Sequence, residues 1–372
     1  MKFQIEKNAF VRTLQRVQGV VERRNTMPIL ANILLKAQPG KIEVMATDLE
    51  ISIKDLCDAA VTKEGSITIN ARKLFEIIKE APEDKIDISA EENGKITIKS
   101  GKAKFNIMSL PVEEFPSFPS YDEGKLVRVT PEIVKEMIEK TAFASSTDET
   151  RYNINGVYVE KEGANIRMVA TDGHRLALIE RKSEWPDLDK GVILPRKGVF
   201  ELKRFLDTHE EGTISLAFTP NSMVVKQDST ILIMRLIDGE FPDYKQVIPK
   251  GNERMVRVER LGFLSSLKRV SLLSLEKGRG VKFGLSKGKL ELSSNNPDMG
   301  EAREELNADY KNDGLEIGFN ATYMMDVLEV INGDEVVLEL KDRESPAVLK
   351  LAAPSQGGHA DDYMYVIMPM RI

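Results

Sequence analysis

Apolar and polar positions change their period along this chain, which predicts short strands interleaved with amphipathic helices. Residues 2–7 (KFQIEK) and 126–130 (LVRVT) alternate apolar and polar side chains, as half-buried strands do. The stretch after the first of these strands has helical spacing, with one apolar face formed by Phe10, Leu14, Val17 and Val21. Later strand pairs are expected to turn at the Gly-containing segments QPGK (38–41), KEGAN (161–165) and SKGK (286–289).

The same pattern occurs three times at a fixed distance. Three similar segments start 124 residues apart: KIEVMATDLE (41–50), NIRMVATDGH (165–174) and KLELSSNNPD (289–298). A second set keeps this step, with ARKLFEII from Ala71, PRKGVFEL from Pro195 and FNATYMMDVL from Phe319. A looser third set comprises SLPVEEFPS (109–117), RLIDGEFPDY (235–244) and the terminal YVIMPMRI. Because a fixed step across several motifs indicates an internal repeat, we expect three copies of one unit.

Each repeat is expected to run β-α-β-β and then α-β-β, with short additions. The second helix of the last copy could be capped by Asn320 or Thr322. Two helices on one side of an antiparallel sheet give an α+β layer, so the fold class is α+β. We place the repeats at 1–120, 121–250 and 251–372, with the linkers FPSFPSYDEGK (115–125) and IPKGNER (248–254) between them.

Composition limits the class of protein. The chain has 372 residues, of which 41% are hydrophobic, so two or three cores are possible. Its one cysteine, Cys57, excludes an internal disulfide framework and a Cys-rich zinc site, and a lone thiol suits a reducing cytoplasm. No stretch has the pattern of a signal peptide or the length of a membrane span. We therefore expect a cytoplasmic protein that makes no contact with membranes.

The segment ATDGHR (170–175) has the residue types of a catalytic loop, because it brings Asp172 close to His174. Its first copy, ATDLEI, has no histidine, and the shared Thr47/Thr171 and Asp48/Asp172 fall where a strand turns. Asp at such turns caps nearby backbone N–H groups, which explains these residues without catalysis. The chain also lacks HExxH, GxSxG, a Gly-rich phosphate loop and any metal-spaced cluster. We expect no enzyme, no metal and no cofactor; the alternative is a hydrolase using Asp172 and His174.

Charge is distributed unevenly. The net charge is −6, yet four of the six segments around the expected helices are net positive. A basic helical layer could face phosphates, which supply affinity without sequence information. The alternative is a solvated helical face on a monomeric repeat scaffold that binds only proteins.

The repeats, the basic helical layer and the C-terminal motif together resemble one family, the bacterial β sliding clamps, which are processivity subunits of DNA polymerase III. The resemblance covers the whole chain. Its most specific segments are PILANILL (28–35), VATDGHRLA (169–177), ILPRKGVFEL (193–202), GEFPDY (239–244), IGFNATY (317–323) and VIMPMRI (366–372).

The resemblance implies a head-to-tail homodimer that forms a closed ring of six similar units around duplex DNA, held without sequence preference. It implies a dimer interface that includes Phe105, Leu272 and Leu273. It implies DNA contacts from Arg24, Arg72, Lys73, Arg196, Lys197, Lys203 and Arg204.

The resemblance also implies a groove for short linear motifs of the DNA polymerase III alpha subunit, the clamp loader, other polymerases and repair proteins. One wall would comprise Ile154, Thr171, Gly173, His174, Arg175, Leu176, Pro242 and Val247. The other wall would comprise Asn320, Tyr323, Pro346, Val366, Met368, Pro369, Met370 and Arg371. Two positions differ from some relatives, which have an aromatic residue at Gly278 and Arg at Gln246.

Overall fold

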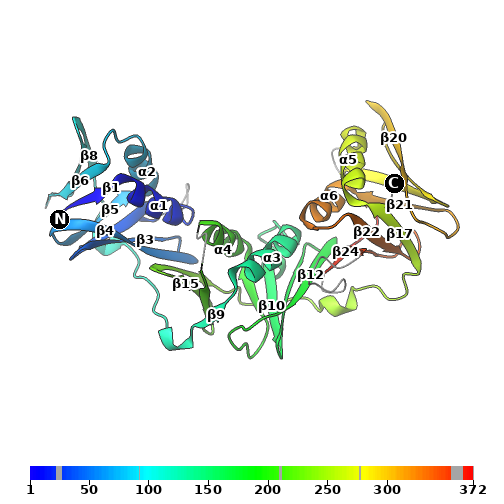
Figure 1. The fold of residues 1–372 in the computed structure, drawn as a ribbon, viewed down its shortest axis with the longest axis horizontal. Helices are drawn as coiled ribbons and strands as arrows, with labels where there is room; N and C mark the ends of the chain where they lie inside the picture. The colour runs from blue at the N-terminus through cyan, green and yellow to red at the C-terminus, as the bar shows by residue number, and fades with distance from the viewer. Residues whose placement is uncertain (22–26, 92, 209–211, 276–277, 353–362, 372) are drawn as a thin grey trace. The chain divides into compact units, whose positions relative to one another are not determined.

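The computed structural model describes residues 1–21, 27–91, 93–208, 212–275, 278–352 and 363–371 (Figure 1). The residues of the chain form two compact units, each with dense contacts within itself. Unit 1 comprises Met1–Pro131, Glu184–Asp187 and Lys197–Leu236, and unit 2 comprises Glu132–Ser183, Leu188–Arg196 and Ile237–Ile372. The second repeat thus contributes to both units, and the boundaries near 120 and 250 stay a prediction.

Unit 1 contains the first repeat and part of the second. The first repeat supplies β1 (Lys2–Glu6), α1 (Lys7–Val17), β2 (Asn32–Gln38), β3 (Lys41–Thr47), β4 (Ile51–Lys63), β5 (Gly65–Asn70), α2 (Ala71–Lys79), β6 (Lys85–Ala90), β7 (Lys95–Ser100) and β8 (Ala103–Met108). The second supplies β9 (Val127–Val129), α4 (Arg196–Thr208), β14 (Ile214–Phe218), β15 (Ser222–Gln227) and β16 (Thr230–Arg235). One path through this antiparallel sheet runs β8-β7-β6-β1-β4-β16-β15-β14-β9. Strand β4 therefore joins the two repeats within one sheet.

Unit 2 contains the rest of the second repeat and the third. The second repeat supplies α3 (Pro131–Thr141), β10 (Gly156–Glu162), β11 (Asn165–Thr171), β12 (Arg175–Lys182) and β13 (Val192–Pro195). The third supplies β17 (Arg254–Glu259), α5 (Arg260–Val270), β18 (Gly280–Ser286), β19 (Lys289–Asn296), β20 (Gly300–Asn307), β21 (Leu315–Asn320), α6 (Ala321–Val330), β22 (Glu335–Leu340), β23 (Ala347–Leu351) and β24 (Tyr363–Ile367). The sheets run β13-β10-β11-β12-β24-β23-β22-β17 and β20-β19-β18-β21, and β12 pairs with β24 across the repeat boundary.

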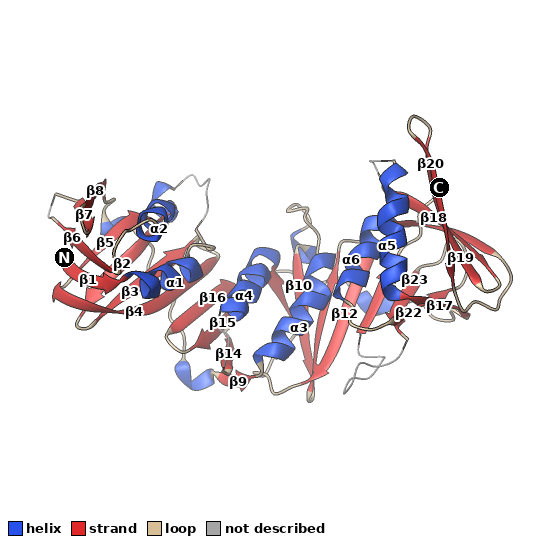
Figure 2. Ribbon diagram, turned by 45° about the horizontal axis from the view of Figure 1, so that its top comes forward, coloured by secondary structure: helices blue, strands red, loops and turns tan. Residues whose placement is uncertain are grey.

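The expected α+β repeat is confirmed in outline. Helices α1 and α2 pack beside each other, as do α5 and α6 (Figure 2). Glycines with positive φ form the predicted strand turns: Gly40 at +79°, Gly163 at +62° and Gly288 at +79°. These backbone angles cost an L-residue energy but suit glycine, which explains why all three turns carry one.

Helix caps fix where the second helices begin. The Asn70 side chain accepts a hydrogen bond from Lys73 N, and the Asn320 side chain accepts one from Tyr323 N. Asn320, and not Thr322, is therefore the cap of α6. The helices α2, α4 and α6 begin at Ala71, Arg196 and Ala321. These starts lie 125 residues apart, so the 124-residue register predicted for this set was wrong by one residue per step.

The first helix is shorter than its apolar pattern suggested. Phe10, Leu14 and Val17 are buried as predicted, but α1 ends at Val17. Residues 18–20, with Gly19 at their centre, form a turn. This turn buries Val20 in place of Val21, which stays half-buried. The predicted order also missed β4 and β5, which follow β3 directly and are the main reason that the first repeat has more strands than expected.

The segment expected to link the first two repeats is part of unit 1 and packs within it. Phe115 lies in a cluster with Ile29 and Leu30. Phe118 and Tyr121 cover a second cluster that includes Val224 and Ile233. The segment therefore contributes apolar burial as well as connecting repeats. Within the described chain, no helix is both long enough and apolar enough to cross a lipid bilayer.

Candidate partner-binding pocket

The turn between β11 and β12 is built by backbone hydrogen bonds to two side chains. Asp172 Oδ1 accepts from His174 N at 2.9 Å and from Arg175 N at 3.1 Å. Thr171 Oγ1 accepts from Gly173 N and donates to the Arg175 carbonyl oxygen at 2.6 Å. Gly173 sits at a φ of +91°, a conformation that glycine adopts without strain. The capping role predicted for Asp172 is confirmed.

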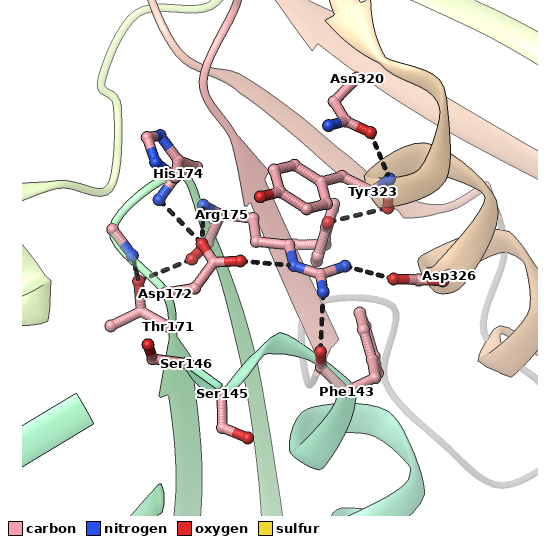
Figure 3. A network of polar contacts seen from close by, with 12 residues as sticks. Phe143, Ser145, Ser146, Thr171, Asp172, His174, Arg175, Asn320, Tyr323 and Asp326 are labelled. Carbon is pink, nitrogen blue, oxygen red and sulfur yellow. Dashed lines mark hydrogen bonds and ion pairs between the residues drawn. The ribbon is translucent and has the colours of Figure 1, made fainter. Parts of the chain in front are cut away.

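The side chain of Arg175 connects this turn to two other elements (Figure 3). Its Nε donates to Asp172 Oδ2 at 3.1 Å, Nη1 to Asp326 Oδ2 at 2.6 Å, and Nη2 to the Phe143 carbonyl oxygen at 2.8 Å. Its guanidinium carbon lies 4.3 Å from the centre of the Tyr323 ring. Burial alone would lower the pKa of Arg175, but its hydrogen bond with Asp326 contributes to raising it. The guanidinium therefore stays charged in a mostly buried place.

A pocket of about 210 Å³ opens beside this turn. The described residues that line it are Arg151, Ile154, Thr171, Gly173, His174, Arg175, Leu176, Pro242, Asp243, Tyr244, Val247, Val366 and Met368. Ile154, Leu176 and Val366 are almost fully buried, whereas Val247 and Met368 are 44% and 41% exposed. The pocket thus combines a buried apolar floor with an exposed apolar rim, which is typical of a surface that receives apolar groups.

The size of the pocket limits what it can hold. An apolar cavity of about 150 Å³ accepts a benzene molecule. At about 210 Å³, this pocket accommodates one or two apolar side chains rather than a whole metabolite. Met368 suits such a rim because its side chain is flexible and polarisable.

The structure brings together most of the predicted groove. Ile154, Thr171, Gly173, His174, Arg175, Leu176, Pro242, Val247, Val366 and Met368 all line the pocket. Tyr323 does not line it but stacks against His174, with ring centres 6.5 Å apart. Asn320 caps the helix that carries Tyr323, as described above. Pro346 lies elsewhere in unit 2, where its carbonyl oxygen accepts from the Asn252 side chain.

The predicted tail residues Pro369, Met370 and Arg371 line a different hollow. It measures about 580 Å³ and is also lined by Lys282, Glu316, Ile317, Gly318, Arg343 and Glu344. Met370 N donates to the Gly318 carbonyl oxygen at 2.9 Å, which ties the tail to the edge strand β21. At Gly278 an added Cβ would lie 3.4 Å from Met370 Cε, in van der Waals contact with this tail.

Sequence reasoning missed three lining residues: Arg151, Asp243 and Tyr244. The Tyr244 hydroxyl donates to Glu160 Oε1 at 2.5 Å and accepts from Arg167 Nη1 at 2.9 Å. Burial raises the pKa of Tyr244, and the hydrogen bond to Glu160 raises it further. Its phenol is thus protonated and held as a wall of the pocket. The motif GEFPDY contained the signal, because it carries a large aromatic next to the predicted Pro242.

The geometry gives no support to acid–base chemistry by Asp172 and His174. Asp172 Oδ1 is occupied by backbone N–H groups and its Oδ2 by Arg175. A catalytic carboxylate would instead orient the imidazole of the histidine. The His174 ring stacks on Tyr323. Among the described residues, no group of three or more His, Cys, Asp or Glu side chains could hold a metal ion.

The predicted DNA contacts occupy varied environments. Arg72 and Lys73 both pair with Glu76 at 2.8 Å and are largely exposed. Lys197 pairs with the buried Asp48, and Arg204 donates to the Gln15 carbonyl oxygen. Arg196 and Lys203 are half-buried on α4, and Arg24 lies outside the described residues.

The predicted dimer contacts are accessible. Phe105 lies on the edge strand β8 and is 37% exposed. Leu272, in the short 3₁₀ helix Ser271–Leu273, is 76% exposed, and Leu273 is half-buried. Exposed apolar side chains on a free strand edge are a common feature of surfaces that pair with another chain.

Comparison with protein families accounts for nearly the whole chain. Residues 1–119 match the N-terminal domain of the DNA polymerase III beta subunit, 128–243 its central domain, and 245–371 its C-terminal domain. The chain belongs to the DNA polymerase III beta subunit family. The resemblance inferred from the repeats and motifs is thereby confirmed, and so is the fold of three similar α+β domains.

Relatives named beta sliding clamp match over full length. The protein of Pseudomonas putida is 38% identical over 375 residues, and that of Caulobacter vibrioides is 38% identical over 380 residues; each alignment covers 100% of both chains.

Solved beta-subunit structures agree with this fold. The sliding clamp of Pseudomonas aeruginosa superposes with a TM-score of 0.92 at 36% identity, with 100% of each chain covered. The clamp of Bartonella birtlesii, solved bound to griselimycin, gives 0.93 at 36% identity, also with 100% of each chain covered. The beta subunit of Thermotoga maritima gives 0.91 at 29% identity, covering 100% of this chain and 99% of that one.

Proposed function

We propose that two copies of this chain close head to tail into a ring around duplex DNA, and that the ring tethers the replicative polymerase as a processivity factor. Membership of the beta-subunit family over the full chain supports this function. The ring works in the bacterial cytoplasm, where it slides because it encircles DNA without sequence-specific contacts. Weak phosphate contacts permit such movement.

The pocket at the β11–β12 turn is the proposed docking site for short linear motifs. Its buried floor and exposed rim suit a leucine or phenylalanine anchor, with His174 and Arg151 available to polar groups of the same peptide. Such motifs would come from the DNA polymerase III alpha subunit, the clamp loader, other polymerases and repair proteins. This pocket is the observation that carries the tethering role.

The proposed DNA contacts are Arg24, Arg72, Lys73, Arg196, Lys197, Lys203 and Arg204. Arg72 and Lys73 have the most accessible charges of those described, at 71% and 65% side-chain exposure. The proposed dimer contacts are Phe105 from one subunit against Leu272 and Leu273 of the other. In that arrangement β8 gains a strand partner at its free edge.

Retention on circular DNA tests the ring. Labelled protein is loaded onto nicked circular DNA by the clamp loader and ATP, and the DNA is isolated by gel filtration. We expect co-elution with the circle and release when a restriction enzyme linearises it, because a ring slides off an end. A protein that stays on linear DNA is a tight binder, and a protein that never co-elutes fits the monomeric scaffold; either result contradicts the proposal.

Peptide binding tests the pocket separately. A fluorescein-labelled hexapeptide with leucine and phenylalanine near its C-terminus serves as the probe. We expect His174→Ala to weaken binding while the protein still loads onto circular DNA. Equal binding by both proteins would show that the peptide docks elsewhere.

A further inference from the structure

Asp326 on α6 reaches from the third repeat into the turn of the second repeat. Its Oδ2 accepts from Arg175 Nη1 at 2.6 Å, while the other Arg175 nitrogens are bonded to Asp172 and to the Phe143 carbonyl (Figure 3). Asp326 does not line the pocket. We infer that Asp326 is a positioning residue for the pocket, which acts through Arg175 and sets the His174 wall. This inference rests on the proposed docking function.

Arg175 transmits the position of Asp326 to the pocket wall by two routes. Its guanidinium lies 4.3 Å from the Tyr323 ring, and that ring stacks on His174 with centres 6.5 Å apart. Its backbone begins β12, next to His174, whose carbonyl oxygen accepts from Met368 N at 2.9 Å. A shift of the guanidinium therefore moves both the ring behind His174 and the strand end that holds the rim residue Met368.

The negative charge of Asp326 stabilises the buried guanidinium of Arg175. The Arg175 side chain is only 8% exposed, and a mostly buried guanidinium is stable only when its donors have partners. The carboxylate of Asp172 already accepts three hydrogen bonds, two of them from backbone N–H groups. An amide at position 326 would keep the shape but weaken the interaction, because the ion pair with the guanidinium is replaced by a hydrogen bond to a neutral acceptor.

The corresponding helix in the preceding repeat shows that this carboxylate pairing is not a general requirement of the fold. The step of 125 residues between α4 and α6 places Glu201 where α6 has Asp326. The turn near α4 has Ile51 in place of Arg175, and Ile51 is fully buried. The carboxylate–guanidinium pair is therefore specific to the turn that borders the pocket.

Matched substitutions on α6 test the inference in the full-length protein. Asp326→Asn removes the charge that faces Arg175. Glu329→Gln removes an exposed charge from the same helix, where Glu329 pairs with Lys268 at 2.7 Å. Binding of griselimycin and of the labelled hexapeptide is measured by calorimetry and fluorescence anisotropy. We expect about tenfold weaker binding by Asp326→Asn, less than about twofold change by Glu329→Gln, and partial rescue by Asp326→Glu.

The imidazole resonance of His174 provides a local signature. It is the histidine signal that disappears in His174→Ala, and we expect it to shift in Asp326→Asn but not in Glu329→Gln. Unchanged affinity together with an unmoved His174 resonance in Asp326→Asn overturns the inference and leaves the docking function intact. If the wild-type protein binds neither probe, the docking function itself is wrong.

A folding defect would not block the test. If Asp326→Asn does not fold, Asp326→Ser takes its place, because it also removes the charge and leaves only a small hydroxyl. A shifted His174 resonance with weaker probe binding then supports the inference, and wild-type values for both overturn it.

Discussion

The turns 47–51 and 171–175 have the same backbone frame and different surroundings. In each, Oδ1 of an aspartate accepts hydrogen bonds from two backbone N–H groups. The donors are Glu50 and Ile51 in the first turn, and His174 and Arg175 in the second. In each, the preceding threonine donates to the carbonyl oxygen of the last turn residue. The two repeats therefore keep one hydrogen-bonded frame.

The side chains on that frame decide what each turn does. Ile51 fills the core of unit 1, and the second oxygen of Asp48 pairs with Lys197 of α4. At the corresponding place Arg175 bridges Asp172, Asp326 and Phe143, and a pocket opens beside it. The comparison teaches that the same turn frame can border either packed core or an open pocket, depending on a few side chains.

The largest expected difference between the two turns is the stability that their charged side chains contribute. Arg175→Met leaves Asp172, Asp326 and the Phe143 carbonyl without their shared donor. Because breaking a buried ion pair costs about 3–5 kcal/mol, we expect a loss of that order in unit 2. Amide hydrogen exchange of residues 171–176 and 321–330 measures this loss of stability.

The matched change in unit 1 is Lys197→Met. Lys197 is 35% exposed but Asp48 only 2%, so this change leaves a buried carboxylate without its cation. Asp48 Oδ1 keeps its two backbone N–H donors, and we expect a loss of about 1–3 kcal/mol, smaller than for Arg175→Met because one partner is removed and not three. Fluorescence of Trp185, the single tryptophan, follows unit 1 because its ring stacks on Phe218 there. If Arg175→Met and Lys197→Met lower the free energy of unfolding by similar amounts, the two turns do not differ in the stability that their charged groups provide.

A smaller difference lies in the third turn residue, which has positive φ in both copies. Gly173 has a φ of +91° and Leu49 a φ of +80°. Gly173→Ala should cost about 1 kcal/mol, because alanine is strained there and its Cβ would lie 2.8 Å from Arg151 Nη2. Leu49→Gly should raise the free energy of unfolding by up to about 1 kcal/mol, because the strain disappears and Leu49 is 54% exposed. The midpoints of denaturant unfolding check both predictions. Midpoints that shift in the same direction in the two variants would contradict them.

The smallest expected effect concerns the helix carboxylates. Burial raises the pKa of Glu201, and the nearby Asp48 adds to this rise against the opposing effects of Arg204 and Lys197. Folding therefore favours the neutral acid, so Glu201 contributes stability at low pH that is lost as the pH rises through its folded pKa. Glu201→Gln should stabilise unit 1 at neutral pH by about 1 kcal/mol or less and have no effect below about pH 4. A stabilisation that persists at low pH would exclude titration of Glu201 as its cause.

Local patterns predicted much of the fold. The three strand turns, the second helices and the Asp caps at 48 and 172 follow from residues close in sequence, whose hydrogen bonds form within a few positions. The repeat also indicated which segments correspond, and the motifs indicated most of the residues that line the pocket.

Long-range packing accounts for what the pattern missed. The role of Tyr244 depends on Glu160 and Arg167, which lie far away in sequence. The bond between Arg175 and Asp326 spans two repeats, so neither position alone reveals it. Val21 was predicted on the buried face because its spacing continues that of Val17, but the helix ends one turn earlier.

Strands β4 and β12 each belong to one repeat and pair with a strand of the next, β16 and β24. A repeat cut out at its sequence boundary would expose one such edge, and the middle repeat two, with N–H and C=O groups left unpaired. The three copies in the sequence are therefore not interchangeable modules. An engineer who wishes to graft or exchange a part of this protein would have to move the two strands of a junction together.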